Sequence, residues 1–304
     1  MEVKLTHDSP EYRVAWLNKM RGVPLNEMEE RAFTGSAYVV PDSTANKVID
    51  ALVDMVPLLN EVELLRVKGN VSFAVQSAAP APTEAAGGAG LDEATTTLVQ
   101  VSLGSYTLAT LVRIGADIAS MAIDAFEGWL TGKIAEQLSY KIEEYIVKGN
   151  GSSAPTGIDE ISWTDNANAI DWGDTALADD DIDQAIGLLP AAYDKNAKFL
   201  MSKKTFFNNV IGLTDTNNVP IVQREGGKYL IRGYPVLFSD KCDVNDIFFG
   251  DFKRGVVANL SNEIKIERDR NLAYNSWDYL GWCSFDCKPS GINCIVKIAA
   301  DIVA

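Results

Sequence analysis

The segment that most constrains the fold of this chain runs from Ala116 to Asn150. We expect a short helix near Ala116–Met121 and then a longer one that begins at Asp124. The Asp124 carboxylate can accept hydrogen bonds from the first-turn N–H groups, and Glu127 stands where a capping-box partner belongs. Apolar residues then recur at spacings of three and four, which is typical of a helix that buries one face. They are Trp129, Leu130, Ile134, Leu138, Ile142, Tyr145 and Ile146.

Glycines occur inside this helix and at its end. Gly128 and Gly132 each cost about 1 kcal/mol relative to alanine, and we attribute the pair to close packing against a sheet. A membrane GxxxG seam is excluded because charged residues interrupt the segment. Gly149 follows the last apolar turn and suits a left-handed C-terminal cap. About 25 helical residues, rising ~1.5 Å each, span roughly 37 Å, the width of a small domain.

Length and charge restrict the class of protein. A chain of 304 residues can bury a sizeable core and form one or two domains. Its net charge of −15 argues against a general nucleic-acid binder, which needs Lys and Arg to meet phosphates. The sequence contains no run of about 18 apolar residues, so we expect no membrane span. Met1–Pro10 also lacks the apolar run of a signal peptide.

The residues that could carry chemistry are few. The four cysteines form no CxxC pair and the single histidine is His7, so we expect buried, reduced thiols rather than a zinc site. One histidine also makes a Ser-His-Asp or Cys-His arrangement implausible. The acidic run Asp179–Asp181 reads as the N-terminus of a helix. We therefore expect no cofactor, no metal and no catalytic residue, although paired carboxylates of an acidic cytosolic hydrolase stay possible.

In the first hundred residues we expect two helices followed by a long β-hairpin. We expect an amphipathic helix within Glu11–Gly22, with Val14, Trp16 and Leu17 available for burial, and a second helix at Ser43–Met55. Two alternating segments then predict antiparallel strands, at Val71–Val75 and Val99–Leu103. Between them lies Ser77–Thr96, rich in Ala, Pro and Gly. An isolated hairpin is marginally stable in water, so we expect this one to gain order from a partner.

The second half reads as mixed strands and helices. Ala197–Met201 is a predicted strand, and Ser202 caps a predicted helix, Lys203–Leu213, that points Phe206, Phe207, Val210 and Ile211 inward. Strands are expected at Val219–Leu230, Tyr234–Phe238 and near Ile247–Phe252. A long strand at Ile264–Arg268, a charged turn at Asp269–Asn275 and a returning strand through Trp277–Phe285 predict a ribbon. Ile292–Ile298 is the last predicted strand.

Several motifs in this order carry a resemblance to a known family. The long helix ends in Tyr145–Gly151 and is followed by Ala154–Ile158. Further on come Gly233-Tyr234-Pro235-Val236 and Gly250-Asp251-Phe252. Each motif is weak alone, but the ordered set, from about Glu11 to the end, resembles the major capsid proteins of tailed phages, which have the Hong Kong 97-type fold.

The resemblance implies an α+β capsid fold with an N-terminal arm, an extended β-hairpin loop, a peripheral domain with a long spine helix, and an axial domain with a central mixed sheet. The expected boundaries are an arm at 1–40, peripheral segments at 41–65, 113–154 and 254–286, the hairpin loop at 66–112, and axial segments at 155–253 and 287–304.

The resemblance also implies a function. The expected protein is a major capsid protein of a tailed bacteriophage, assembled in the host cytoplasm into the pentamers and hexamers of an icosahedral virion shell. Its partners would be further copies of itself, a portal, and scaffolding or cement proteins. It would enclose double-stranded DNA without sequence-specific binding and would contact no membrane. An encapsulin-like protein compartment is the alternative.

The arm, the hairpin and the ribbon tip are the expected contacts between subunits in this family. The residues we predict there are Arg13, Trp16, Arg66, Lys68, Asp92, Glu93, Asp269 and Arg270. In some members of the family a hairpin lysine forms a covalent crosslink with an asparagine of a neighbouring subunit. This chain has no Lys or Arg between Gly69 and Val112. Non-covalent contacts would therefore have to hold the shell.

Overall fold

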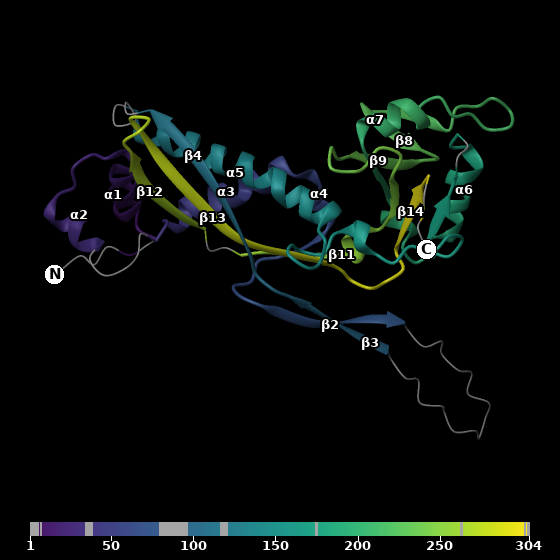
Figure 1. Cartoon of the computed structure of the whole chain (residues 1–304), viewed down its shortest axis with the longest axis horizontal. Coiled ribbons are helices and arrows are strands. Elements are labelled where there is room, and N and C mark those ends of the chain that lie inside the picture. The colour runs from purple at the N-terminus through teal and green to yellow at the C-terminus, as the bar shows by residue number, and fades with distance from the viewer. Residues whose placement is uncertain are drawn as a thin grey trace, which may run out of the picture.

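The computed structural model describes residues 6, 8–33, 39–78, 97–115, 121–173, 176–261, 264–300 and 302. The molecule is elongated, with one sheet and its helices at one end and a second sheet at the other (Figure 1). The five-stranded sheet takes strands from both halves of the sequence, whereas the strands of the seven-stranded sheet all come from the second half. A two-stranded hairpin projects from the middle of the body (Figure 1).

The long helix α5, Ile123–Lys148, is the spine of the first end. Its predicted apolar stripe is confirmed: Leu130, Ile134, Leu138, Ile142 and Ile146 are all buried. The stripe lies against a five-stranded sheet in the order β1-β11-β13-β12, with β4 paired to β13. These strands are β1 (Glu63–Leu65), β4 (Tyr106–Gly115), β11 (Val256–Leu260), β12 (Lys265–Asn271) and β13 (Ser276–Pro289).

One glycine of the sheet sets how closely the spine packs. A Cβ added at Gly281, on β13, would lie 3.0 Å from Cγ2 of Ile134 on α5. The helix therefore approaches the sheet at a position where no other residue fits without movement. Nearby, the Phe126 and Tyr279 rings are 5.9 Å apart, which extends the same contact toward the start of α5.

Among the described residues, four helices precede the hairpin, and two of them cover the spine. They are α1 (Pro10–Arg21), α2 (Glu27–Ala32), α3 (Asp42–Met55) and α4 (Pro57–Glu61). The predicted helices at 11–22 and 43–55 are confirmed, with Trp16, Leu17, Val48, Ile49 and Leu52 buried. Val14 is exposed, contrary to the prediction. α1 and α3 pack on α5, so the spine is covered by helices as well as by the sheet.

The other end of the molecule is built on a seven-stranded mixed sheet in the order β5-β14-β10-β6-β9-β8-β7. Helix α6 (Asp179–Leu188), which has the predicted acidic first turn, packs beside β14 and β5. A core of its own fills this end, including Phe199, Phe206 and Phe249. The strands are β5 (Ala169–Asp171), β6 (Lys198–Met201), β7 (Val222–Glu225), β8 (Lys228–Ile231), β9 (Tyr234–Phe238), β10 (Ile247–Gly250) and β14 (Ile295–Ala299).

Short helical turns join these elements. They are η2 (Ile158–Glu160), η3 (Asp194–Asn196), α7 (Lys203–Thr205), the π-helical turn η4 (Phe206–Val210) and α8 (Phe252–Gly255). Ser202 caps α7 as predicted, with its Oγ accepting from the Thr205 N–H. Among the residues described, no helix is both long and apolar enough to cross a membrane.

The predicted hairpin is confirmed. Strands β2 (Val71–Ala78) and β3 (Thr97–Leu103) pair antiparallel, from Val71 opposite Leu103 to Ala78 opposite Thr97. Most of the Ala/Pro/Gly-rich loop between them, 79–96, lies outside the described residues. The predicted short helix at 116–121 falls almost wholly outside them as well.

The spine helix ends before Gly149 as predicted, but the predicted caps at its two ends are wrong. Ala122 is the N-cap residue and makes no side-chain cap bond, so Asp124 lies inside the first turn and Glu127 is not a capping-box partner. Gly149 has φ −61° and ψ 134°, an extended rather than a left-handed conformation. The helix ends because the chain turns there to pair with itself: the Gly157 N–H donates to the Gly149 carbonyl at 2.8 Å.

Two further predictions are corrected. A Cβ at Gly128 or Gly132 would meet no described atom within 4 Å, so this pair does not mark close packing. The strands predicted around Glu225-Gly226-Gly227 are present as β7 and β8, which are joined by a turn in which both glycines have positive φ. Asp269 and Arg270 lie within β12, paired with Asp278 and Trp277, rather than in the turn.

The predicted inward face of Lys203–Leu213 is half right. Phe206 and Val210 are buried, but Phe207 and Ile211 are 51% and 39% exposed. The predicted domain limits stay a prediction. Two strands cross the expected limits: β4 of the five-stranded sheet begins at Tyr106, inside the segment expected for the hairpin loop, and β13 continues to Pro289, beyond 286.

Substituting alanine at two glycines of the spine should give opposite changes in stability. An added Cβ at Gly149 would overlap the Pro155 carbonyl oxygen, so Gly149→Ala should lower the free energy of unfolding by about 2 kcal/mol or more. At Gly128 the space is open, so Gly128→Ala should raise it by roughly 0.5–1 kcal/mol. Urea unfolding measures both, and a destabilised Gly128→Ala variant would contradict this account of the helix.

Candidate functional site

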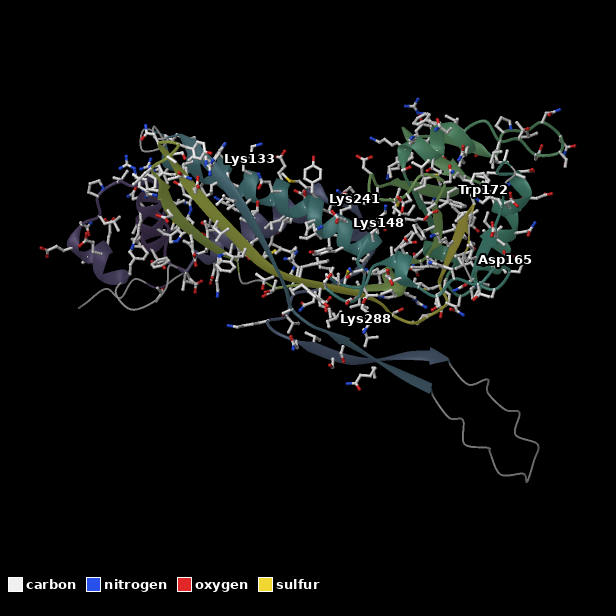
Figure 2. The ribbon with its side chains drawn as sticks, viewed as in Figure 1. Lys133, Lys148, Asp165, Trp172, Lys241 and Lys288 are labelled. Atoms are coloured by element: carbon white, nitrogen blue, oxygen red, sulfur yellow. The ribbon has the colours of Figure 1, made fainter. Side chains whose placement is uncertain are left out.

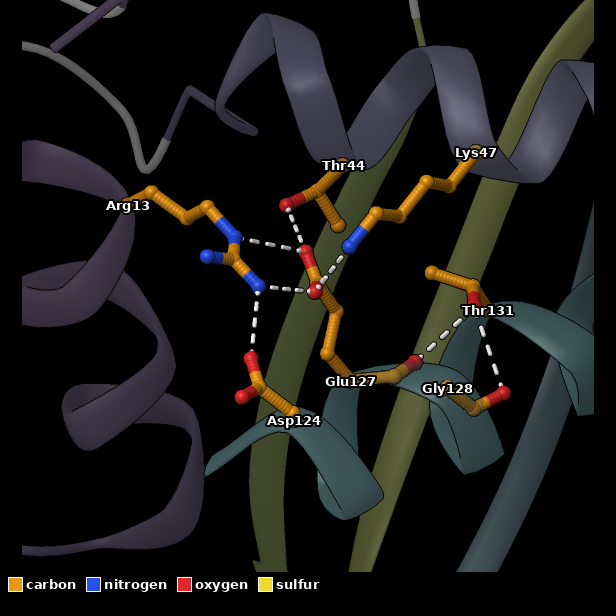
Figure 3. Close-up of polar contacts among 7 residues, drawn as sticks. All are labelled: Arg13, Thr44, Lys47, Asp124, Glu127, Gly128 and Thr131. Carbon is orange, nitrogen blue, oxygen red and sulfur yellow. Dashed lines mark hydrogen bonds and ion pairs between the residues drawn. The ribbon is translucent and has the colours of Figure 1, made fainter. Parts of the chain in front are cut away.

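A buried polar cluster joins the N-terminal helix to the spine (Figure 3). Its centre is Glu127 on α5, whose side chain is 1% exposed. The Arg13 guanidinium, from α1, donates to both Glu127 oxygens at 3.1 and 2.5 Å, and its Nη2 also donates to Asp124 at 3.0 Å. From α3, Lys47 Nζ donates to Glu127 Oε2 at 2.5 Å and Thr44 Oγ1 donates to Oε1 at 2.7 Å. One carboxylate therefore links three helices.

The electrostatics of the cluster favour the ionised carboxylate. Burial alone would raise the pKa of Glu127. Hydrogen bonds from Arg13, Lys47 and Thr44, with the positive charge of Arg13, outweigh burial and lower that pKa to about 2. The same contacts raise the pKa of Arg13. A carboxylate so far from water is costly unless paired, so the two cations and the hydroxyl are needed for α1 to dock.

Apolar contacts complete the docking of α1. Trp16 is fully buried, and the Tyr279 hydroxyl on β13 donates to the Met20 carbonyl at 2.6 Å. The Tyr12 hydroxyl donates to the Val39 carbonyl at 2.9 Å. Trp16 thus packs inside its own chain, and its role as a contact between subunits stays a prediction. Arg13 likewise serves its own chain, through Glu127 and Asp124.

Two polar side chains fix the roots of the projecting hairpin. The Asn259 amide of β11 pairs with the chain just before β2: it donates to the Val67 carbonyl and accepts from the Val67 N–H, both at 3.0 Å. At the other root, the buried Asp286 accepts a hydrogen bond from the Gly104 N–H, just after β3. Burial raises the pKa of Asp286. The hairpin is thus held at its base while its strands pair with each other.

The remaining predicted contact residues are not gathered into one site. Arg66 and Lys68 are exposed beside the first root of the hairpin. Asp92 and Glu93 lie outside the described residues. Asp269 and Arg270 are exposed on β12, at the far end of the ribbon from the hairpin. Their roles as contacts stay predictions.

The seven-stranded end presents an apolar surface that sequence reasoning assigned to the core. Phe207 lies on η4, Ile211 follows its last residue, and both side chains are exposed. The Phe207 ring is 6.1 Å from the ring of Tyr229 on β8. Val219 and Val244, at this same end, are 54% and 47% exposed. Exposed apolar side chains of this size are typical of a surface that contacts another protein.

The groups that could carry chemistry have structural explanations. All four cysteines are free and buried, and burial raises the pKa of Cys242, Cys283 and Cys294 to about 12, which leaves them as inert thiols. Asp159, Asp243 and Asp246 lie close enough to share a cation. Lysines already pair with all three: Lys297 Nζ lies 2.6 Å from Asp159 and 2.8 Å from Asp246, and Lys148 pairs with Asp243. Figure 2 shows how polar side chains are spread along the whole body.

Sequence reasoning missed the residues that organise this structure. The sequence showed Glu127 as an acidic residue among apolar neighbours. It did not show its partners Arg13 and Lys47, because both lie more than 70 residues away in the sequence. Asn259, Asp286 and Lys297 gave no local signal, since their partners are also distant in the sequence.

Comparison with known proteins decides the family. The family model described as the phage capsid family matches residues 36–299. This chain belongs to the phage capsid family. A search of curated proteins gave no match. As a member of the family the chain is a capsid shell protein of the virion, and its family and fold point to a structural role rather than to catalysis.

Solved structures agree on the fold. The capsid of an empty GTA particle is 21% identical and matches with a TM-score of 0.68 over 81% of this chain and 89% of that one. The Microbacterium phage Oxtober96 structure is 15% identical, with a TM-score of 0.57 over 81% and 91%. The satellite phage P4 procapsid is 9% identical, with a TM-score of 0.55 over 85% and 99%. The predicted Hong Kong 97-type fold is confirmed.

The Glu127 cluster should make stability depend on pH. Because the folded state lowers the pKa of Glu127 from 4.5 to about 2, its contribution is complete above about pH 5 and is lost as the pH falls toward 2. Glu127→Gln should therefore cost about 3 kcal/mol of unfolding free energy at neutral pH, and the difference from wild type should shrink through that window. Urea unfolding at a series of pH values measures it.

Glu136→Gln is the matched control on the same helix. Glu136 pairs with Lys133 at 2.7 Å, but both side chains are about half exposed, so the loss should stay below about 0.5 kcal/mol. If Glu127→Gln matched this control at neutral pH, the cluster would not hold α1 in place.

Proposed function

We propose that this protein is the major capsid protein of a tailed bacteriophage. Its copies form the pentamers and hexamers of a closed icosahedral shell around double-stranded DNA. The observation that carries the proposal is the projecting hairpin: β2 and β3 pair with each other and extend away from the body (Figure 1). A two-stranded hairpin is marginally stable alone. A neighbouring subunit of the shell supplies the surface that it lacks here.

The apolar surface of the seven-stranded end supports contacts within each pentamer or hexamer. Phe207 and Ile211 are exposed on and just after a short helix rather than buried in the core beneath it. A ring of subunits that meet through this end would cover them. Many modest interfaces of this kind, repeated by closed symmetry, give a stable shell although each one is small.

The charge of the chain suits a DNA container. With a net charge of −15, the wall repels the phosphate backbone and does not hold the genome by sequence. Assembly takes place in the host cytoplasm, with a portal and with scaffolding or cement proteins as further partners. The enclosed molecule distinguishes this function from that of an encapsulin-like compartment, which would hold protein.

Removing the loop of the hairpin tests the proposal. Deleting Ala78–Gly90 shortens the projection, almost entirely within a segment outside the described residues, and leaves the Asn259 and Asp286 root contacts in place. We expect soluble subunits with an unchanged unfolding midpoint that fail to form shells in electron micrographs and sedimentation velocity. Shells of normal size and yield from this variant would contradict the role assigned to the hairpin.

Two adjacent phenylalanines allow a matched test of the apolar surface. Phe207→Ser should impair assembly and change unfolding free energy by less than about 0.5 kcal/mol, because Phe207 is exposed. Phe206→Ser should instead cost about 3–5 kcal/mol, because Phe206 is fully buried. Chemical denaturation and sedimentation velocity separate the two effects, and full assembly of Phe207→Ser would rule out this surface as a contact.

A further inference from the structure

A basic pocket lies at the free end of the ribbon, between β12, β13 and the end of α1. Its volume is about 210 Å³, and its lining residues are Lys19, Met20, Arg268, Asp269, Arg270 and Trp277. The Trp277 ring forms its apolar part: the Arg268 guanidinium lies 3.4 Å from the ring centroid and that of Arg270 lies 5.8 Å from it. Three cations and one carboxylate thus surround one indole.

Two arginines of the pocket carry positive charge that no carboxylate of the described residues neutralises. Among the residues described, neither Arg268 nor Arg270 has a carboxylate partner. Arg268 donates to the Lys19 carbonyl, and its Nε is buried with no acceptor in the part of the chain that the structure describes. The carboxylate of Asp269 accepts from the backbone N–H of Arg270 rather than from a guanidinium. A carboxylate that entered the pocket could pair with both guanidinium groups.

The short helix α2 has the complementary chemistry. Its first turn is fixed by a reciprocal cap: Asn26 Oδ1 accepts from the Glu29 N–H at 2.9 Å, and Glu29 Oε2 accepts from the Asn26 N–H at 2.9 Å. Glu29 is used in this way, whereas Glu27 and Glu30 are exposed and have no cation partner within the described ranges. Three residues apart, they lie on one side of the helix. Met28 beside them is 60% exposed.

The positions of these two surfaces favour a partner of the same kind. Helix α2 lies at the same end of the elongated molecule as α1 and the ribbon turn between β12 and β13 (Figure 1), and residues of α1, β12 and β13 line the pocket. Copies that meet around an axis at this end can each place α2 against the next copy's pocket, which is a heterologous contact that closes into a ring. The wider surface of an acidic chain repels another copy, so a local basic pocket also fixes where two copies meet.

We propose that the pocket binds α2 of a second copy of this chain, with Glu30 or Glu27 of one subunit paired to Arg270 and Arg268 of the next. This contact rests on the proposed shell function and adds a specific interface to it. It is separate from the hairpin and from the Phe207 surface, which lie elsewhere on the molecule.

Charge reversal tests the contact. Arg270→Glu and Glu30→Arg should each raise the protein concentration needed for half-maximal assembly by about tenfold or more, because each places like charges together. The double variant Arg270→Glu/Glu30→Arg should return to within about threefold of wild type. Both side chains are exposed, so the unfolding midpoint of each variant should stay unchanged. Lys195→Glu, an exposed reversal away from the pocket, is the matched control and should leave assembly unaltered.

Mixing the two single variants separates a contact between copies from one within a chain. Equal amounts of Arg270→Glu and Glu30→Arg subunits should recover part of the assembly, because each can pair with the other. Absence of recovery on mixing, together with rescue in the double variant, would show a contact within one chain and overturn the proposal. Normal assembly of both single variants would overturn it and leave the shell function intact, whereas wild-type subunits that never associate would contradict both.

Discussion

Burial of α5 on two sides is the constraint on which the rest of the structure depends. Its stripe from Leu130 to Ile146 packs on the five-stranded sheet, and α1 and α3 cover it as well. Each fully buried aliphatic side chain of this kind contributes roughly 1.5–3 kcal/mol. The strands that meet the helix come from positions 106–115 and 256–289, so its burial draws distant parts of the chain into one body.

The Glu127 cluster adds specificity to this apolar contact. Hydrophobic packing alone tolerates small rotations of α1 over α5, whereas a buried carboxylate must keep Arg13, Lys47 and Thr44 within hydrogen-bond distance. The cluster therefore fixes the direction in which the chain leaves α1 and enters α2. That direction places α2 at the ribbon end of the body, beside the contact proposed for the basic pocket.

Elements with local signals could be predicted from the sequence, and elements set by distant partners could not. Spacings of three and four identified the α5 stripe, and alternation identified β2 and β3. The same reasoning made Glu127 a capping residue, because its partners are far away in the sequence. It also placed Phe207 and Ile211 in the core, whereas both are exposed. The sequence indicates that an apolar side chain favours burial, but not whether its own core or a partner protein buries it.

Electron cryomicroscopy of the purified wild-type protein tests the central claim most directly. The account predicts closed hollow particles built from clusters of five and six subunits, with each β2–β3 hairpin lying on the adjacent subunit. Nucleic acid inside the particles would further support a phage shell, and cargo protein would indicate an encapsulin-like compartment. Subunits that remain monomeric with a scaffolding partner present, or particles whose hairpins fold back on their own chains, would contradict the account.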